Sequence, residues 1–195
     1  AVDLVAVSGG YTPTVHLSSH LGSKPVYSPA IHGFLPAALP AGHFCAGAMS
    51  GSQDMASAID SGAQTALKAL AGLGASGSSD AVPPLPGDLP GASMAFQPLP
   101  VLRHPQCRGK AFIDFQHDVH ADDVELAHRE GFVSVEHLKR YTTMGMATDQ
   151  GKTSNMGALS ALAAARGLPI EQVGTTTFRP PYTPVTVGAL AGRGV

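Results

Sequence analysis

The chain has 195 residues, of which 44% are hydrophobic, so it can bury one core or two small ones. Charged residues make up only 13%, about half the usual share, which favours a surface covered by other protein. A net charge of -2 without a basic run argues against a nucleic-acid or acidic-membrane partner.

The cysteines, the apolar runs and the first residues of the sequence indicate in which compartment we expect the protein. Cys45 and Cys107 are far apart and lack metal-ligand spacing, so we expect neither a disulfide nor a metal site, in a reducing cytoplasm. No apolar run approaches the roughly 18 residues of a membrane span. The opening AVDLVAVSGG lacks Met and a basic segment, so we expect no signal peptide and an internal piece of a longer protein.

The first part of the chain predicts strands and a short helix. Residues 2–10 form a β-branched apolar run stopped by two glycines, the pattern of a buried parallel strand. Thr12 and Pro13 then indicate an N-cap and a first helical residue, opening a short helix over residues 16–21. Residues 24–28 are a further candidate strand.

A second strand and helix follow. Residues 43–51 predict a second buried strand that runs into a glycine turn. Apolar side chains at helical spacing then predict a helix from about residue 55 to residue 70. From residue 71 to residue 100 the composition shifts to Gly, Ser and Pro, which predicts a linker and a domain boundary.

The last 85 residues or so predict a small, mainly helical piece. A short strand is expected over residues 111–115. The expected helices that follow it cover residues 122–132, 134–144 and 154–167. Gly131 and Gly167 close the first and third helices, and Ser134 is the expected N-cap of the second.

The chain then leaves its regular helices. Pro169 starts a short helical turn, and residues 175–192 are expected to form an extended tail held by prolines. The pattern alone therefore predicts an α/β piece followed by a small, mainly helical piece, which is a mixed α+β arrangement overall.

The loop YTTMGMATDQGKTSN, residues 141–155, ends in the letters GKT that suggest phosphate binding. A P-loop needs its first glycine at position 146, which is Met146, and it needs a preceding strand where a helix is expected. A nucleotide-binding P-loop is therefore disfavoured. Backbone amides, Lys152 and the hydroxyls of Thr153 and Ser154 can still converge on one phosphate before the helix. A capped helix with a solvated lysine explains the same residues.

Two further patterns carry weaker signals. Arg179 stands between Phe178 and two prolines, which would order its guanidinium for an anion, although a plain surface turn is equally open. The histidine pairs at 16 and 20 and at 117 and 120 lack a third ligand, so no metal site is predicted.

A long stretch of the chain resembles a known family. KAFIDFQHDVHADDVELAHREGFVSVEHLKRYTTMGMATDQGKTSN, followed by TTFRPPYTPVT, resembles the alpha subunit of heterotetrameric sarcosine oxidase. The resemblance implies oxidation of sarcosine to glycine, with formation of hydrogen peroxide and transfer of the one-carbon unit to tetrahydrofolate. It also implies NAD in the complete alpha subunit, FAD in the beta subunit and FMN at their boundary, with the beta and other small subunits as partners.

The resemblance also implies a domain plan. Residues 1–72 would be the C-terminal part of a FAD/NAD(P)-type nucleotide-binding domain, and residues 73–109 a Pro/Gly-rich linker. Residues 110–174 would be the helical domain, and residues 175–195 a tail leading toward a folate-binding domain that the chain lacks. Without a G-x-G-x-x-G motif in it, we expect this chain alone to bind NAD poorly.

Site residues follow by resemblance. The FMN phosphate side would be lined by Gln150, Gly151, Lys152, Thr153, Ser154 and Arg179. NAD would be approached by Gly9, Gly10 and Gly47. No catalytic residue is assigned to this chain, because in this family the residues that oxidise sarcosine belong to the beta subunit.

The helical piece has a second resemblance, to the [2Fe–2S] domain of the bacterioferritin-associated ferredoxin type in opine and proline dehydrogenases. The four cysteine positions of that domain hold Asp114, Gln116, Asp149 and Ser154 here. Because iron–sulfur clusters need thiolates, we expect a cluster-binding scaffold without a cluster.

Two other functions stay open at this point. A non-catalytic scaffold subunit that keeps only the subunit contacts would fit the low charge and the missing motifs. An opine or another N-methyl amino acid could replace sarcosine as the substrate, because substrate contacts lie elsewhere.

Overall fold

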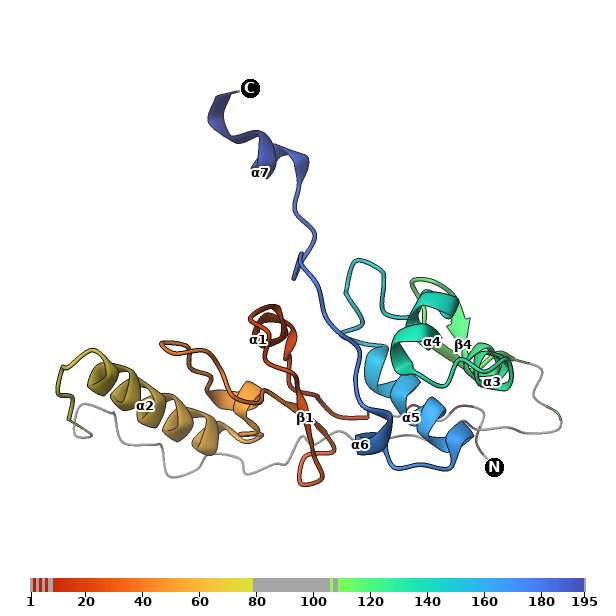
Figure 1. Ribbon diagram of the computed structural model, residues 1–195, viewed down its shortest axis with the longest axis horizontal. Coiled ribbons are helices and arrows are strands. Elements are labelled where there is room, and N and C mark those ends of the chain that lie inside the picture. The colour runs from red at the N-terminus through yellow and green to blue at the C-terminus, as the bar shows by residue number, and fades with distance from the viewer. Residues whose placement is uncertain are drawn as a thin grey trace. The chain divides into compact units, whose positions relative to one another are not determined.

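The computed structural model describes residues 2, 4, 6, 9–78, 106 and 109–194, and these mix helices with short strands, as expected (Figure 1). The chain divides into two compact units, unit 1 (Ala1–Pro98) and unit 2 (Leu99–Val195). No described helix combines the length and apolar character needed to cross a membrane.

Unit 1 has a small core around a helix and a hairpin. Helix α1 spans His16–His20, and the antiparallel strands β1 (Val26–Ser28) and β2 (Gly33–Leu35) pair across a tight turn. Tyr27 faces Phe34 across the hairpin, edge to face with ring centroids 5.4 Å apart. The buried apolar side chains in the described part of this unit include Val15, Ile31 and Phe34.

The second part of unit 1 is helical. The 3₁₀-helix η1 spans Gly47–Ser50 and contacts helix α2, Met55–Gly72. Helix α2 begins where the Asp54 carboxylate accepts a hydrogen bond from the Ser57 N–H at 2.9 Å. The helix confirms the predicted apolar spacing, but none of its residues is buried.

The buried strand predicted over residues 43–51 is wrong. Residues 43–46 have no regular structure, and η1 follows, with Gly47 at φ 66° and Gly51 at φ 96°. These left-handed backbone angles are incompatible with an extended strand. The Ser50 hydroxyl donates to the Gly47 carbonyl at 2.9 Å, so a local turn forms instead of a sheet.

Two further expectations for unit 1 need correction or lie outside the described residues. Helix α1 has Val15 rather than Thr12 at its N-cap position, with no side-chain cap, so the cap prediction is wrong. Four of the nine residues of the predicted 2–10 strand are not described. Val2 and Leu4 are 76% and 82% exposed, so they are not part of a buried strand.

Unit 2 is a helical cluster introduced by a short hairpin. Strands β3 (Phe112–Asp114) and β4 (Val119–His120) pair antiparallel and lead directly into α3, Ala121–Arg129. The remaining helices of the cluster are α4 (Val135–Thr142), α5 (Asn155–Arg166) and α6 (Ile170–Val173). Helix α3 contacts α4 and α5, and α5 contacts α6. The larger core side chains include Val119, Val124, Leu138, Met144, Leu159, Leu162 and Phe178.

The ends of these helices follow the sequence closely. Gly131 and Gly167 adopt left-handed backbone angles, and the next residue in each case returns its N–H to the helix, Phe132 to Ala127 and Leu168 to Ala163. The predicted glycine closures are therefore confirmed. Ser134 precedes α4 as predicted, but its hydroxyl makes no capping bond.

The tail departs from the extended form predicted over residues 175–192. Helix α7 spans Val187–Ala191 and is followed by η3, Gly192–Gly194. The cause is a local cap, because the Thr186 hydroxyl accepts a hydrogen bond from the Ala189 N–H at 3.3 Å.

Candidate functional site

The α4–α5 loop, residues 143–154, is held in a tightly turned path. Thr143, Gly145, Gln150 and Gly151 all have positive φ angles, between 52° and 73°. A Cβ added at Gly151 would lie 3.2 Å from the Gly145 Cα, so two backbone segments pass each other closely there. The loop is therefore a shaped element rather than a flexible connection.

Asp149 organises the second half of this loop. Its carboxylate accepts hydrogen bonds from the Thr153 hydroxyl at 2.7 Å and from the N–H groups of Gly151 and Thr153 at 3.1 and 3.2 Å. Burial opposes ionisation, but these hydrogen bonds and the Lys152 charge together lower the pKa of Asp149 below its ordinary value. The carboxylate thus takes up donors that the sequence suggested for a phosphate.

Asp114 organises the base of the loop. The side chain is 2% exposed, and its carboxylate accepts from the Gly145 N–H at 2.8 Å, the Gln116 N–H at 3.0 Å and the Ser154 hydroxyl at 3.3 Å. Gln116 in turn accepts a hydrogen bond from the Thr148 hydroxyl at 2.8 Å. Three of the four residues at the cysteine positions of the resembling cluster domain therefore form one hydrogen-bonded group.

Lys152 ties the tail to the loop. Its ammonium donates to the backbone carbonyls of Tyr182 and Asp149 and lies 4.2 Å from the centroid of the Tyr182 ring. A cation above an aromatic face is attracted by the ring quadrupole, which adds to the two hydrogen bonds. The Lys152 ammonium is therefore already engaged within unit 2.

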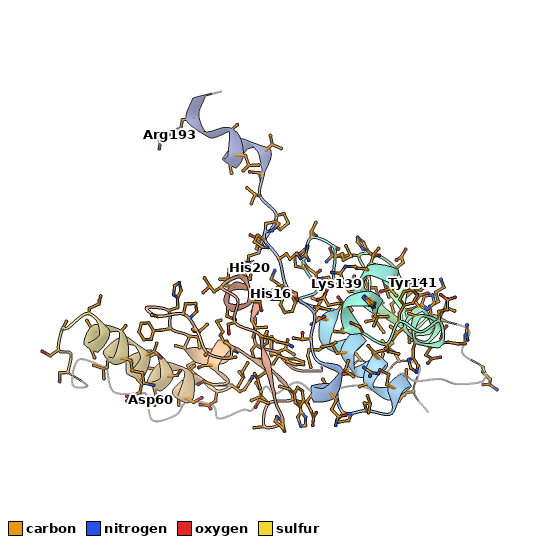
Figure 2. All side chains as sticks on the ribbon, viewed as in Figure 1. His16, His20, Asp60, Lys139, Tyr141 and Arg193 are labelled. Atoms are coloured by element: carbon orange, nitrogen blue, oxygen red, sulfur yellow. The ribbon has the colours of Figure 1, made fainter. Side chains whose placement is uncertain are left out.

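Beside the loop lies an open cleft of about 150 Å³, which we call the basic cleft. Figure 2 labels one of its residues, Lys139, on α4. The lining residues come from α4, from the α4–α5 loop and from the start of the tail. They are Glu136, Lys139, Arg140, Met146, Gln150, Thr177 and Arg179.

The carboxylate of the basic cleft is already occupied. Glu136 accepts a hydrogen bond from the Thr177 N–H and forms an ion pair with Arg140 at 3.2 Å. Burial works against its ionisation, but the Thr177 hydrogen bond and the charges of Lys139 and Arg140 lower the pKa of Glu136. Glu136 therefore stays ionised and holds Arg140 and the tail in place.

Lys139 has a different environment. Its ammonium donates to the Thr177 carbonyl at 3.1 Å, which is a neutral partner. Burial lowers the pKa of Lys139, Glu136 partly offsets this, and the positive charges of Arg179 and Arg140 lower it further. The cations of the basic cleft are thus close enough to repel one another.

The structure divides the residues predicted for FMN into two groups. Gln150 and Arg179 line the basic cleft, whereas Lys152 donates its hydrogen bonds elsewhere. The N–H of Gly151, the hydroxyl of Thr153 and the hydroxyl of Ser154 donate to carboxylates of the loop and its base. The assignment of all six to FMN stays a prediction.

The residues predicted to approach NAD lie in unit 1. Gly9 and Gly10 precede α1, and Gly47 begins η1. The Gly47 N–H donates to the Ser61 hydroxyl at 3.2 Å. Their assignment to NAD also stays a prediction. In the described part of the chain, no three His, Cys, Asp or Glu side chains gather as metal ligands would.

The sequence reasoning missed Glu136, Lys139 and Arg140 as site residues. A usable signal was present, because the spacing of Glu136 and Arg140 predicts an ion pair on one helix face. Nothing in the pattern indicated that residues 177–179 return to this face.

Solved structures provide a first comparison. The crystal structure of L-proline dehydrogenase from P. horikoshii superposes with a TM-score of 0.67 at 16% sequence identity, covering 92% of this chain and 37% of that one. At this identity the likeness concerns the fold alone. The fold is thus one that a dehydrogenase also contains.

Sequence comparisons are more specific. Residues 108–193 match the family described as sarcosine oxidase A3 domain. The chain is 44% identical over 192 residues to the sarcosine oxidase subunit alpha of Rhizobium meliloti (strain 1021), covering 98% of this chain and 19% of the relative. It is 41% identical over 198 residues to that of Corynebacterium sp. (strain P-1), covering 98% and 20%. The chain belongs to the sarcosine oxidase alpha-subunit family and spans about one fifth of the length of these curated relatives.

Proposed function

We propose that this chain is part of the alpha subunit of an oxidoreductase of the sarcosine oxidase type, and that unit 2 helps to hold FMN and to contact the beta subunit. The observation that carries the proposal is the 41–44% identity to sarcosine oxidase alpha subunits along 98% of the chain. The complete enzyme would oxidise sarcosine to glycine, form hydrogen peroxide and pass the one-carbon unit to tetrahydrofolate.

The role of this chain in that enzyme is binding and positioning. NAD would belong to the complete alpha subunit and FAD to the beta subunit, in the cytoplasm, and no residue of this chain is assigned to the oxidation step. Bound FMN supplies an isoalloxazine ring that accepts and passes on electrons. This chain would contribute the surface that fixes where that cofactor lies.

The residues of unit 2 fit an anionic cofactor group. Arg179 and Gln150 line a cleft in which the positive side chains outnumber the carboxylate. The adjoining loop is fixed by the hydrogen bonds of Asp149 and Asp114, and Gln150 within it donates its side-chain amide to the Ala147 carbonyl at 2.8 Å, so this wall of the cleft is rigid. A positively charged cleft with a rigid wall binds an anion without first being ordered.

The test is flavin analysis of the complete alpha subunit assembled with its beta subunit. Replacing Arg179 by Met removes a charged donor of the basic cleft, so we expect the FMN content per complex to fall severalfold. Arg166→Met is the matched control, because Arg166 donates to the Val133 carbonyl and does not line the cleft.

Three results would contradict the proposal. An unchanged FMN content in Arg179→Met would remove Arg179 from the cofactor site. An assembled complex without FMN, even in the wild type, would favour the non-catalytic scaffold. A complex that oxidises an opine or another N-methyl amino acid in preference to sarcosine would change the substrate and leave the role of unit 2 intact.

A further inference from the structure

The residues that line the basic cleft include three cations, Lys139, Arg140 and Arg179, and one carboxylate, Glu136. Glu136 forms an ion pair with Arg140 at 3.2 Å and accepts a hydrogen bond from the Thr177 N–H, so its carboxylate already has partners within unit 2. Lys139 donates to a neutral carbonyl, at 3.1 Å. No hydrogen bond or ion pair joins the Arg179 guanidinium to another residue that the structure describes. The cleft therefore has a net charge of about +2 at neutral pH.

Lys139 and Arg179 line the same cleft. Burial is the main cause of the lowered pKa of Lys139, and the nearby charge of Arg179 lowers it further. Repulsion of this kind raises the free energy of the empty cleft, and a bound anion would remove it. Burial of Lys139 strengthens the effect, because charges interact more strongly where water is partly excluded.

The backbone holds these cations in place. Phe178, directly before Arg179, is 6% exposed and anchors the tail in the core of unit 2. Thr177 is bonded on both sides, through its N–H to Glu136 and through its carbonyl to Lys139. Lys139 and Arg179 thus reach the cleft from a helix and from an irregular segment that is held by hydrogen bonds and by the buried Phe178 ring, so the pair is preorganised.

We propose that the basic cleft is the binding site for a phosphate monoester, whose phosphate oxygens are contacted by Lys139 and Arg179. A phosphate monoester carries about -1.5 to -2 charges at pH 7, which matches the net positive charge of the cleft. Met146 borders the same cleft and offers an apolar contact to the esterified group.

The proposal deepens the proposed function where the monoester is FMN, and in that respect it rests on it. It also differs from the site expected from the sequence, because it assigns the phosphate to Lys139 rather than to Lys152. Lys152 already donates to two carbonyls and lies over the Tyr182 ring. The proposal therefore predicts that substitution of Lys139 weakens phosphate binding and that substitution of Lys152 does not.

The first experiment titrates the 195-residue chain with inorganic phosphate and follows the backbone amide signals of Thr177 and Arg179 by NMR. We expect saturable shifts in the wild type. Lys139→Met and Arg179→Met should each weaken phosphate binding about tenfold, the value typical of one charge-assisted hydrogen bond. Lys152→Met should leave the affinity unchanged. Two independent cleft variants protect the test against one that fails to fold.

The second experiment separates the sources of the phosphate by comparing FMN with riboflavin, which lacks it. Saturable binding of FMN that is weakened in Lys139→Met, with weaker binding of riboflavin, supports the cleft as the cofactor's phosphate site. Binding of inorganic phosphate without binding of FMN supports a site for another monoester and counts against the proposed FMN role.

Three outcomes would overturn the inference. One is the absence of phosphate binding to the folded wild-type chain at millimolar concentrations. Another is a loss of phosphate binding in Lys152→Met with full binding in Lys139→Met, which would return the site to the loop and leave the proposed function standing. The third is FMN binding that is equal in the wild type and in both cleft variants.

Discussion

At the scale of single residues, Asp114 has the most demanding role in unit 2. It is almost fully buried and accepts three hydrogen bonds, from two backbone N–H groups and one hydroxyl. A buried carboxylate is tolerated only when its oxygens are satisfied, and the donors in turn depend on it. The position that resembles a cluster ligand has thus become the hydrogen-bonding centre of the loop.

Removing this carboxylate should therefore unfold the loop or destabilise the whole unit. We expect Asp114→Ala to lower the free energy of unfolding by about 2–4 kcal/mol, because three donors, two of them buried, lose their carboxylate acceptor. Ser154→Ala removes one long hydrogen bond and should cost about 1 kcal/mol. Urea denaturation of the three proteins measures both values. Equal losses in the two variants would show that Asp114 is not the centre of the network.

At the scale of elements, the helices of unit 2 were predictable because their signals are local. Closing glycines indicated the ends of α3 and α5 and Ser134 the start of α4, and the structure places all three helices where the sequence indicated. The strand expected over residues 43–51 failed because a short apolar run is ambiguous and its glycines adopt left-handed angles. Helix α7 was missed because Thr186 was read as part of the proline-rich tail.

The α4–α5 loop offers a test of how tightly an irregular element is built. Gly151→Ala places a methyl group 3.2 Å from the Gly145 Cα and also strains a φ of 73°. Gly167 has a similar φ of 62°, but an added Cβ meets nothing within 4 Å. Gly167→Ala should therefore cost about 1 kcal/mol from strain alone. Gly151→Ala should cost about 1–3 kcal/mol more.

Thermal unfolding of the two glycine variants separates backbone strain from steric contact. Both variants have the backbone strain, and only Gly151→Ala adds a close contact. The expected order is wild type, then Gly167→Ala, then Gly151→Ala. A Gly151→Ala variant as stable as Gly167→Ala would mean that the two loop segments can move apart without loss.

At the scale of the whole molecule, the two units differ in how much they bury. Unit 2 has a continuous apolar core under α3, α4 and α5, whereas the described part of unit 1 buries few large side chains and none from α2. Local stability follows buried apolar contact, so the units should open with different free energies.

Hydrogen exchange of the complete chain tests this difference directly. Amides in the buried turns of α5 should exchange at least about tenfold more slowly than those in the middle of α2, although α2 is the longer helix. Helix length alone would predict the reverse order. Equal protection in α2 and α5 would show that unit 1 is stabilised by contacts beyond those described.

The site was less predictable than the fold, because it depends on contacts between residues that are far apart in the sequence. The sequence pointed to the α4–α5 loop and to Arg179, and both border the basic cleft. It could not show that Asp149 and Asp114 use the donors of the loop, because that depends on contacts across up to 40 residues. Lys139 looked like an ordinary residue of a helix end until the tail was placed beside it.

One consequence of the Asp114 network concerns chemistry in an oxidising environment. Every hydrogen bond that fixes the base of the α4–α5 loop joins carboxylate, hydroxyl, amide or backbone groups, and none involves sulfur. Thiolates are progressively oxidised by peroxide, whereas these groups are not. The hydrogen bonds at the base of the loop therefore need no inserted inorganic centre and should persist when iron is scarce, whereas the Met144 and Met146 thioethers of the same loop remain oxidisable.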